Sequence, residues 1–282
     1  MHSNPNILDC AGRPLDISRP RVMGTLNVTP DSFSDGNQFL DTGTAVLRAE
    51  QMAAEGAAII DIGGESTRPG AADVSLQQEL DRVIPVIEQL SDRTDIPISC
   101  DTSKPEVMTA AISAGAGMIN DVYALQRDGA LEAAAACDVP VCIMHMQGEP
   151  RTMQDAPEYA DVVSDVCEFL VERVHRCVTA GIDTDRILLD PGFGFGKRLE
   201  DNLQLLQHLG TIAALGKPVI AGLSRKSMLG QITGLPVDQR VHASVAAAVL
   251  AASRGASLLR VHDVAATVEA LAVLTALASC ES

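Results

Sequence analysis

The chain has 282 residues, 46% of them hydrophobic, and its 37 acidic and 21 basic side chains give a formal net charge of −16. This charge opposes binding to nucleic acid or to an anionic membrane surface, and no apolar run reaches the roughly 18 residues that span a bilayer. Seven scattered cysteines without a C-x-x-C pair, and a polar N-terminus without a signal-peptide pattern, predict a cytoplasmic protein with free thiols.

The first predicted element is a short hairpin over residues 7–17, which turns at Ala11 and Gly12. After it, no linker rich in proline, glycine or serine and no run of like charges divides the chain. We therefore expect an N-terminal segment, 1–19, followed by one domain, 20–278.

Short apolar runs rich in β-branched residues recur along that domain, each followed by a stretch rich in Ala, Leu and Glu. The predicted strands are 21–28, 57–63, 96–102, 117–123, 139–146, 187–190, 218–223 and 257–262. The predicted helices are 44–55, 76–93, 106–114, 130–136, 159–180, 200–215, 240–254 and 265–278. The repeat averages about 33 residues, which is typical of a βα unit. The pattern predicts an α/β fold, a single (β/α)8 TIM barrel, with a doubly wound open sheet as the alternative.

A polar or charged residue stands at the carboxyl end of every predicted strand: Asn27, Asp61, Asp101, Asn120, His145, Asp190, Lys226, and Arg260 with His262. In a parallel barrel these ends meet at one mouth, where active sites lie. The pattern therefore predicts an enzyme. Any one of these residues could instead cap a helix or a turn, and we assign Asp61 and Asp121 to that role.

Capping does not explain the basic residues Lys226, Arg260 and His262, because the helix N-termini that follow the strands favour anions. Arg260 and His262 are two residues apart on one strand, so their side chains point the same way. Together with Lys226 they predict an anion-binding site. His145 has no such partner in the sequence and is interpreted as structural.

Three loops are candidates for phosphate contact: 27–36, 63–70 and 224–227. Ordinary turn chemistry is the alternative for each. The run 191–197 matches neither nucleotide-binding glycine motif, and its glycines are expected to let the backbone and Phe195 approach a flat ligand. No His/Cys cluster has zinc spacing; the oxygen of Asn27 together with a substrate diphosphate would suit Mg²⁺.

These segments read N-V-T-P-D-S-F-S-D-G (27–36), D-I-G-G-E-S-T-R-P-G (61–70), D-T-S-K-P-E-V (101–107), I-N-D-V (119–122), D-P-G-F-G-F-G-K (190–197), S-R-K-S (224–227) and R-V-H-D (260–263). Together they resemble the bacterial dihydropteroate synthase family, pterin-binding barrels, from about residue 20 to 276. The resemblance implies Mg²⁺-dependent transfer of a dihydropterin methylene from diphosphate to 4-aminobenzoate in folate biosynthesis, and a homodimer formed through the late helices, 240–278.

The resemblance also implies residue roles, which it gives as three groups. Asp101, Asn120, Asp190 and Lys226 would hold the pterin, with Arg260 on its ring face and Met144 in the same pocket. Asn27, Thr67, Arg68, Arg260 and His262 would surround the diphosphate, with Mg²⁺ at Asn27. Phe195, Arg68, Pro69, Lys226 and Ser227 would frame the aminobenzoate, with Thr67 near its junction to the pterin.

The implied chemistry is loss of diphosphate, stabilised by Arg260, His262, Lys226, Arg68 and Mg²⁺, followed by attack of the amine. Asp35 is a candidate for orientation, and we name no general base. Two alternatives remain. A methyltetrahydrofolate:corrinoid methyltransferase would share the fold but not need a diphosphate cluster, and a catalytically silent paralogue would release no diphosphate.

Overall fold

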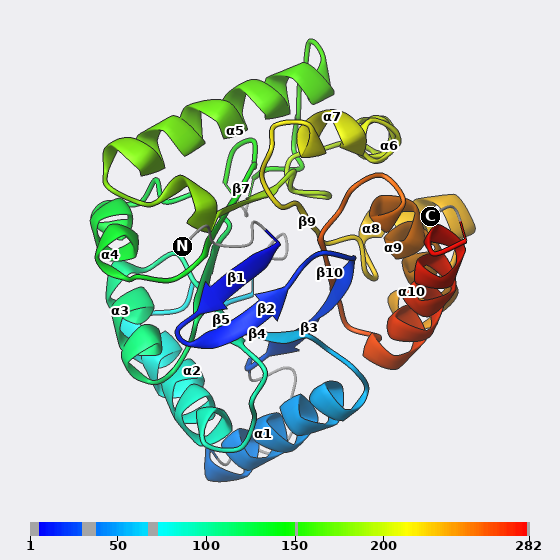
Figure 1. Ribbon diagram of the computed structural model, residues 1–282. Coiled ribbons are helices and arrows are strands. Elements are labelled where there is room, and N and C mark those ends of the chain that lie inside the picture. The colour runs from blue at the N-terminus through cyan, green and yellow to red at the C-terminus, as the bar shows by residue number, and fades with distance from the viewer. Residues whose placement is uncertain (1–5, 30–37, 67–72, 150–151, 281–282) are drawn as a thin grey trace.

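Eight parallel strands close into a barrel surrounded by helices (Figure 1). The computed structural model describes residues 6–29, 38–66, 73–149 and 152–280, without the side chains of 38–41. The strand order is β8-β7-β6-β5-β4-β3-β10-β9, and a parallel bridge between Leu189 and Val219 joins the two ends. The predicted TIM barrel is confirmed, and the open sheet is excluded.

The barrel strands are short and follow the predicted runs. They are β3 (Arg21–Asn27), β4 (Ile59–Gly63), β5 (Ile98–Asp101), β6 (Met118–Asp121), β7 (Val141–Met144), β8 (Ile187–Asp190), β9 (Ile220–Ala221) and β10 (Leu258–Val261). Each predicted strand except 187–190 is longer than the observed strand by one or more residues at one or both ends. The apolar pattern continues into the turns, where the ladder hydrogen bonds have already ended.

The helices form the outer ring: α1 (Gln38–Ala54), α2 (Leu76–Ser91), α3 (Pro105–Ser113), α4 (Ala130–Ala136), α5 (Val162–Thr179), α6 (Leu199–Gln207), α7 (Leu209–Ala213), α8 (Ser227–Thr233), α9 (Val241–Ala252) and α10 (Val264–Ala278). The single helix predicted over 200–215 is divided, because His208 has non-helical angles of φ −107 and ψ 23. The seven-residue α8 was not predicted, because its sequence, with Gly230 in the middle, favours a helix weakly; α4 is as short but is almost all alanine and was predicted.

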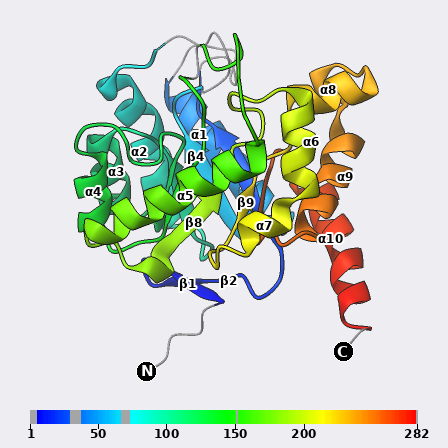
Figure 2. The same cartoon turned by 90° about the horizontal axis from the view of Figure 1, so that it is seen from above.

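The predicted N-terminal hairpin is present as β1 (Ile7–Cys10) and β2 (Arg13–Asp16). Ala11 and Gly12 both have positive φ, 54 and 82, as a tight two-residue hairpin turn requires. The hairpin lies across one end of the barrel (Figure 2). Its buried side chains pack against the apolar residues at the amino ends of the barrel strands, so this end is closed by a hydrophobic plug.

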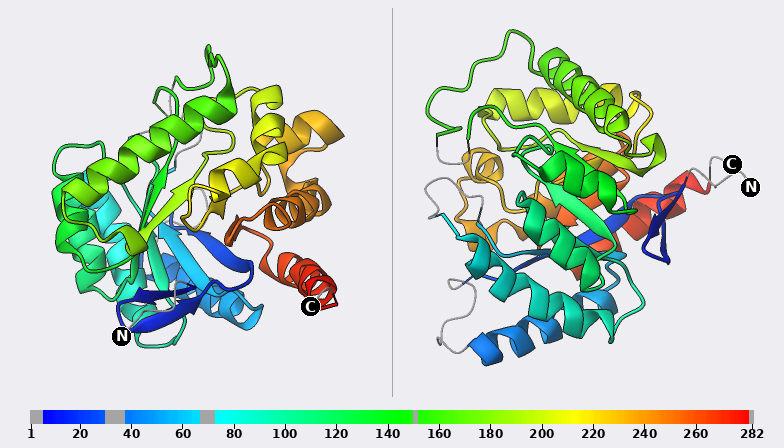
Figure 3. Two further views of the ribbon diagram at one scale, coloured as in Figure 1. Left: turned by 45° about the horizontal axis from the view of Figure 1, so that its top comes forward. Right: turned by 90° about the vertical axis from the view of Figure 1, so that its left-hand side faces the viewer.

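The barrel interior has two layers of side chains. The layer next to the hairpin is apolar and consists of Met23, Ile59, Met118, Cys142, Leu188, Ile220 and Leu258. Side chains two residues further along a strand face the same interior, and there the sequence has Thr25, Asp61, Asn120, Met144, Asp190, Gly222 and Arg260. The interior therefore changes from apolar to mostly polar within one step toward the carboxyl ends. Figure 3 shows the hairpin at the apolar end of the barrel and the helices around the sides of the barrel.

Candidate active site

Arg260 lies at the centre of the polar layer and joins two carboxylates from neighbouring strands. Its Nε lies 2.6 Å from Asp61 Oδ2 and its Nη2 lies 2.7 Å from Asp101 Oδ2. The side chains of Arg260, Asp61 and Asp101 are 22%, 0% and 12% exposed. Burial disfavours the charge of Arg260, but Asp61 and Asp101 outweigh burial and raise its pKa above the usual range. The site therefore contains a permanent guanidinium.

Asp61 is not the turn cap that we expected. Its Oδ2 accepts hydrogen bonds from Arg260 Nε and, at 3.2 Å, from Asn120 Nδ2, so it links β10, β4 and β6 across the barrel. Its position two residues after the buried Ile59 places it inside the barrel, which a turn role does not require. This correction adds Asp61 to the site.

Asp121 does cap a turn, as expected. Its carboxylate accepts hydrogen bonds from the backbone N–H of Tyr123 at 2.9 Å and of Leu125 at 2.7 Å, and from the hydroxyl of Ser103. Asp121 is the last residue of β6 and has none of the cross-barrel contacts of Asp61. The two aspartates thus have different roles despite similar burial.

Asp101 and Asp190 are carboxylates held in low-dielectric surroundings. Burial raises the pKa of Asp101 to about 7, with Arg260 opposing this and Asp61 adding to it. Burial likewise raises the pKa of Asp190, against the effect of Lys226. Asp190 Oδ1 accepts a hydrogen bond of 2.6 Å from the N–H of Gly192. Both groups are acceptors that a neutral heterocycle with N–H donors could satisfy.

Lys226 approaches the same layer from the loop before α8. Its ammonium donates to the carbonyl of Phe193 and lies 4.5 Å from the centroid of the Phe195 ring, an arrangement typical of a cation–π contact. Burial lowers its pKa to about 8, opposed by Asp190 and reinforced by Arg260. Ser227 is the first residue of α8 and is exposed.

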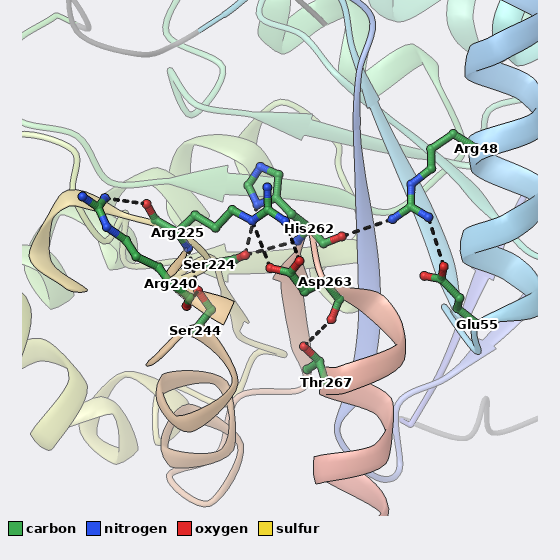
Figure 4. Close-up of polar contacts among 9 residues, drawn as sticks. All are labelled: Arg48, Glu55, Ser224, Arg225, Arg240, Ser244, His262, Asp263 and Thr267. Carbon is green, nitrogen blue, oxygen red and sulfur yellow. Dashed lines mark hydrogen bonds and ion pairs between the residues drawn. The ribbon is translucent and has the colours of Figure 1, made fainter. Parts of the chain in front are cut away.

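A hydrogen-bond network joins the S-R-K-S and R-V-H-D motifs (Figure 4). Ser224 Oγ lies 3.0 Å from His262 Nδ1 and accepts a hydrogen bond of 3.2 Å from His262 N. Arg225, with a positive φ of 59, binds Asp263 through Nε at 3.0 Å and Nη2 at 2.5 Å. Arg240 Nη1 donates to the carbonyl of Arg225 at 3.1 Å. The network fixes His262 and the turn that carries Lys226 relative to each other.

The glycine-rich loop, defined here as residues 191–197, approaches protein backbone. A Cβ on Gly192 would lie 1.8 Å from the carbonyl oxygen of His145, and one on Gly196 would lie 2.4 Å from that of Gln147. Both glycines have positive φ, 68 and 59. We had expected the glycines to admit a ligand; at these two positions they admit the chain that follows β7. Phe195 is partly exposed, so its ring remains available to a ligand.

His145 is buried, as its structural interpretation predicts, and its Nδ1 lies 2.9 Å from the ammonium of Lys197. Met144 is buried and pairs with Asp190 across β7 and β8. Asn27 ends β3, opposite Gly63 of β4, and is partly exposed. Asp35, Thr67, Arg68 and Pro69 lie outside the residues that the structure describes.

The structure thus brings together Asp101, Asn120, Asp190, Lys226 and Arg260. Sequence reasoning missed Asp61 and the buried Lys197. It also missed Lys104, whose ammonium lies 2.5 Å from both Glu65 and Glu79. Strand alternation from Ile59 could have placed Asp61 inside the barrel, whereas the partners of Lys197 and Lys104 come from other loops and leave no local pattern.

Asn27 is an oxygen donor of the kind that Mg²⁺ accepts. Within the described ranges, no three His, Cys, Asp or Glu side chains gather as a metal-binding group. A divalent cation at Asn27 would share this ligand with a substrate diphosphate and water, which is the usual mode for Mg²⁺. The residues fit such an ion. In the same ranges, no helix combines the length and the apolar character of a membrane span.

Comparisons with known proteins agree with this architecture. The family described as "Pterin binding enzyme" matches residues 23–262. Dihydropteroate synthase of Escherichia coli K12 is 52% identical over 270 residues, 96% of either chain. Dihydropteroate synthase of Xanthomonas albilineans, solved with 4-aminobenzoic acid, superposes with a TM-score of 0.92 at 59% identity, covering 96% of this chain and 98% of that one.

The X. albilineans enzyme in complex with 7,8-dihydropteroate superposes with a TM-score of 0.89 at 56% identity, again covering 96% of this chain and 98% of that one. The similarity extends over nearly the whole length of the relatives. By family profile, sequence and structure, this chain belongs to the dihydropteroate synthase family of pterin-binding enzymes.

Proposed function

We propose that the chain condenses (7,8-dihydropterin-6-yl)methyl diphosphate with 4-aminobenzoate to give 7,8-dihydropteroate and diphosphate, as a transferase of folate biosynthesis. The observation that carries the residue assignment is the polar layer around Arg260, where Asp101, Asn120 and Asp190 meet above a closed apolar plug. The ligands of the X. albilineans structures, 4-aminobenzoic acid and 7,8-dihydropteroate, correspond to one substrate and one product of this reaction.

The pterin would lie in the polar layer. An aminopyrimidinone edge presents adjacent N–H donors, and the buried carboxylates of Asp101 and Asp190 are acceptors for them. Asn120 can both donate and accept, and Lys226 can donate to a ring carbonyl or nitrogen. Arg260 would lie against the ring face, in a chain with 2% aromatic residues and no tryptophan. Met144 would close the apolar side of the pocket.

Cleavage of the C–O bond leaves its electron pair on the diphosphate, and the pterin ring can delocalise the positive charge that develops at the methylene. Arg260 and His262, with Arg68 and Thr67, would neutralise the departing anion. Each preorganised contact of this kind is worth roughly 2–4 kcal/mol in rate. Mg²⁺ bound near Asn27 and the diphosphate would supply Lewis-acid charge neutralisation when present.

The amine nitrogen of 4-aminobenzoate then forms the new C–N bond and releases one proton. An arylamine is already unprotonated near neutral pH, so positioning is the main requirement. Phe195, Lys226 and Ser227 would frame the ring and its carboxylate, together with Arg68 and Pro69. Asp35 would orient the reactants.

The direct test is to supply the purified chain with dihydropterin diphosphate, 4-aminobenzoate and Mg²⁺, and to quantify both dihydropteroate and diphosphate. Equal amounts of the two products are expected, with neither formed when one substrate is omitted. Absence of both products from folded protein would refute the function. Transfer of a methyl group from methyltetrahydrofolate would indicate the corrinoid methyltransferase instead.

The late helices support a homodimer. Leu250 on α9 and Val273 and Leu277 on α10 are exposed by 45%, 72% and 61%, and Val273 and Leu277 are one turn apart. Exposed apolar side chains on two neighbouring helices are typical of a subunit interface. We infer that two copies associate through it, in the cytoplasm, with residues 20–278 as one catalytic domain and 1–19 as its N-terminal segment. Sedimentation equilibrium of Val273→Glu against the unaltered chain tests the association.

A further inference from the structure

We propose that Lys197 is a positioning residue for the aminobenzoate half of the site, because it holds the glycine-rich loop, and with it Phe195, in the geometry that the reaction needs. The inference rests on the proposed function and adds a residue that does not itself reach the substrate. Its basis is the buried ammonium of Lys197. This ammonium contacts two backbone carbonyls of the loop and His145, the residue that follows β7.

The ammonium of Lys197 is matched by three close acceptors. Its Nζ lies 2.9 Å from Gly192 O, 3.0 Å from Phe195 O and 2.9 Å from His145 Nδ1. An ammonium has three N–H donors, so each donor has one acceptor. A fourth contact, to His145 O at 3.4 Å, is longer. One side chain therefore fixes both ends of the turn 192–195 to the chain after β7.

Burial makes this arrangement costly, which argues against an incidental contact. Lys197 is 3% exposed, and among the residues that the structure describes its ammonium makes no ion pair. Desolvation lowers its pKa well below the usual range, and the charges of Asp190 and Asp201 oppose that shift without cancelling it. A surface lysine would avoid the penalty entirely. The desolvation penalty is therefore offset by the hydrogen bonds that hold the glycine-rich loop in place.

His145 is suited to remain the acceptor. Burial, and then the charge of Lys197, lower the pKa of its imidazole to about 3, so the ring is neutral at physiological pH. With Nδ1 accepting from Lys197, the ring proton is on Nε2. The ring is held by an edge-on contact with Phe169, with centroids 5.0 Å apart. The acceptor is therefore fixed as firmly as the donor.

The loop needs such fixing because its glycines have little intrinsic preference. Gly192, Gly194 and Gly196 all have positive φ, and glycine visits both signs of φ readily. Other contacts assist Lys197: Tyr159 donates its hydroxyl to Gly196 O at 2.6 Å, and Gly194 N donates to Asn202 Oδ1 at 2.6 Å. These bonds hold Gly194 and Gly196, whereas Lys197 holds Gly192 and Phe195, the two ends of the turn.

The turn contains one of the proposed substrate-binding residues, Phe195, and contacts two others, Asp190 and Lys226. Gly192 N donates to Asp190, Phe193 O accepts from Lys226, and the Phe195 ring faces the ammonium of Lys226. Release of Lys197 would affect Phe195 first, because Asp190 is also held by its strand and the backbone of Lys226 is also held by Arg240. The aminobenzoate pocket should therefore suffer more than the pterin pocket.

The test is Lys197→Met, which keeps the length of the side chain and removes its donors. The matched control is Arg173→Met. Arg173 is also buried, and it also donates to two backbone carbonyls of a left-handed turn, Ala124 O at 2.9 Å and Leu125 O at 3.2 Å, but that turn carries none of the proposed substrate residues. Both variants should lose thermal stability.

For Lys197→Met we expect kcat/KM for 4-aminobenzoate to fall about 10- to 100-fold, the scale of a misplacement near 1 Å, with KM for the pterin diphosphate changed less than about threefold. Faster amide exchange by mass spectrometry in the peptide containing 191–197 gives a readout independent of turnover. Arg173→Met should leave the kinetic constants of both substrates near those of the unaltered chain.

Equal changes for the two substrates, or unchanged kinetics with only lower stability, would overturn the positioning role. If Lys197→Met does not fold, His145→Phe removes one acceptor while preserving the aromatic packing, and it should raise KM for 4-aminobenzoate selectively by a smaller factor. If the unaltered chain makes no dihydropteroate, the proposed function fails, whereas the exchange measurement still decides whether Lys197 fixes the loop.

Discussion

Replacement of Asp61 by asparagine isolates the charge that supports Arg260. The carboxylate is fully buried and accepts from Arg260 Nε at 2.6 Å and from Asn120 at 3.2 Å. A hydrogen bond to a charged partner is worth about 1.5–3 kcal/mol, against about 1 kcal/mol for a neutral one. Asp61→Asn preserves the shape, so the net loss is about 0.5–2 kcal/mol, and kcat/KM for the pterin diphosphate should fall about 2- to 30-fold.

The same substitution should shift the pH profile. Burial raises the pKa of Asp101 to about 7, Arg260 lowers it and Asp61 raises it. Because the pterin needs the ionised form, kcat/KM of the unaltered enzyme should fall as pH decreases through about 7. Asp61→Asn removes a neighbouring negative charge and leaves Arg260 paired mainly with Asp101. Both changes lower the pKa of Asp101, so the acid limb should move to lower pH.

The assay is the pH dependence of kcat/KM for the pterin diphosphate at saturating 4-aminobenzoate. Asp121→Asn is the control, since this aspartate is equally buried but caps a turn and has no bond to Arg260. It should lower the unfolding temperature and move the acid limb less than Asp61→Asn does, because Asp61 raises the pKa of Asp101 more than Asp121 does. An acid limb that stays in place, or moves to higher pH, in Asp61→Asn would refute the coupling between the two aspartates.

Four further outcomes are expected. Arg260→Ala should remove about 2–4 kcal/mol of transition-state stabilisation and so lower kcat/KM roughly 30- to 1,000-fold, with circular dichroism confirming the fold. Near-normal turnover would contradict the placement of Arg260 in the site. Gly192→Ala should lower the free energy of unfolding in urea by about 1–3 kcal/mol or more, because its Cβ would lie 1.8 Å from the carbonyl oxygen of His145. Chelation with EDTA should abolish turnover and added Mg²⁺ should restore it; undiminished activity in the chelator would exclude the ion. Lys226→Met should raise KM for both substrates in steady-state assays, and an effect on neither would contradict its shared placement.

The fold could be predicted because its signals are local. Each strand is a short apolar run, each helix has its own apolar pattern, and eight repeats of about 33 residues leave few architectures. The mistakes occurred where local signals are weak. The break at His208 depends on one pair of backbone angles, and α8 has a glycine in the middle of its seven residues, which weakens its helical signal.

The site could be predicted in part for the same reason. Strand-end residues such as Asn120 and Asp190 follow from the rule that parallel strands present their carboxyl ends together. The role of Asp61 was misjudged because its position in the chain suits a cap as well as it suits the interior. Lys197 could not be recognised, since its value depends on His145, which is 52 residues away. Contacts of this kind are set by tertiary packing and leave no spacing to read.

Asp61 also explains how one guanidinium can serve both the pterin and the diphosphate. In the ligand-free arrangement Arg260 is shared between Asp61 and Asp101. A pterin that draws on Asp101 competes for that carboxylate, and a buried guanidinium without any partner is strongly disfavoured. Because Asp61 has no exposure and keeps its own bond to Nε, Arg260 can give up Asp101 and turn its Nη groups toward an anion while remaining neutralised. Asp61 thus makes the proposed pterin-binding role of Asp101 compatible with the permanent positive charge of Arg260 beside it.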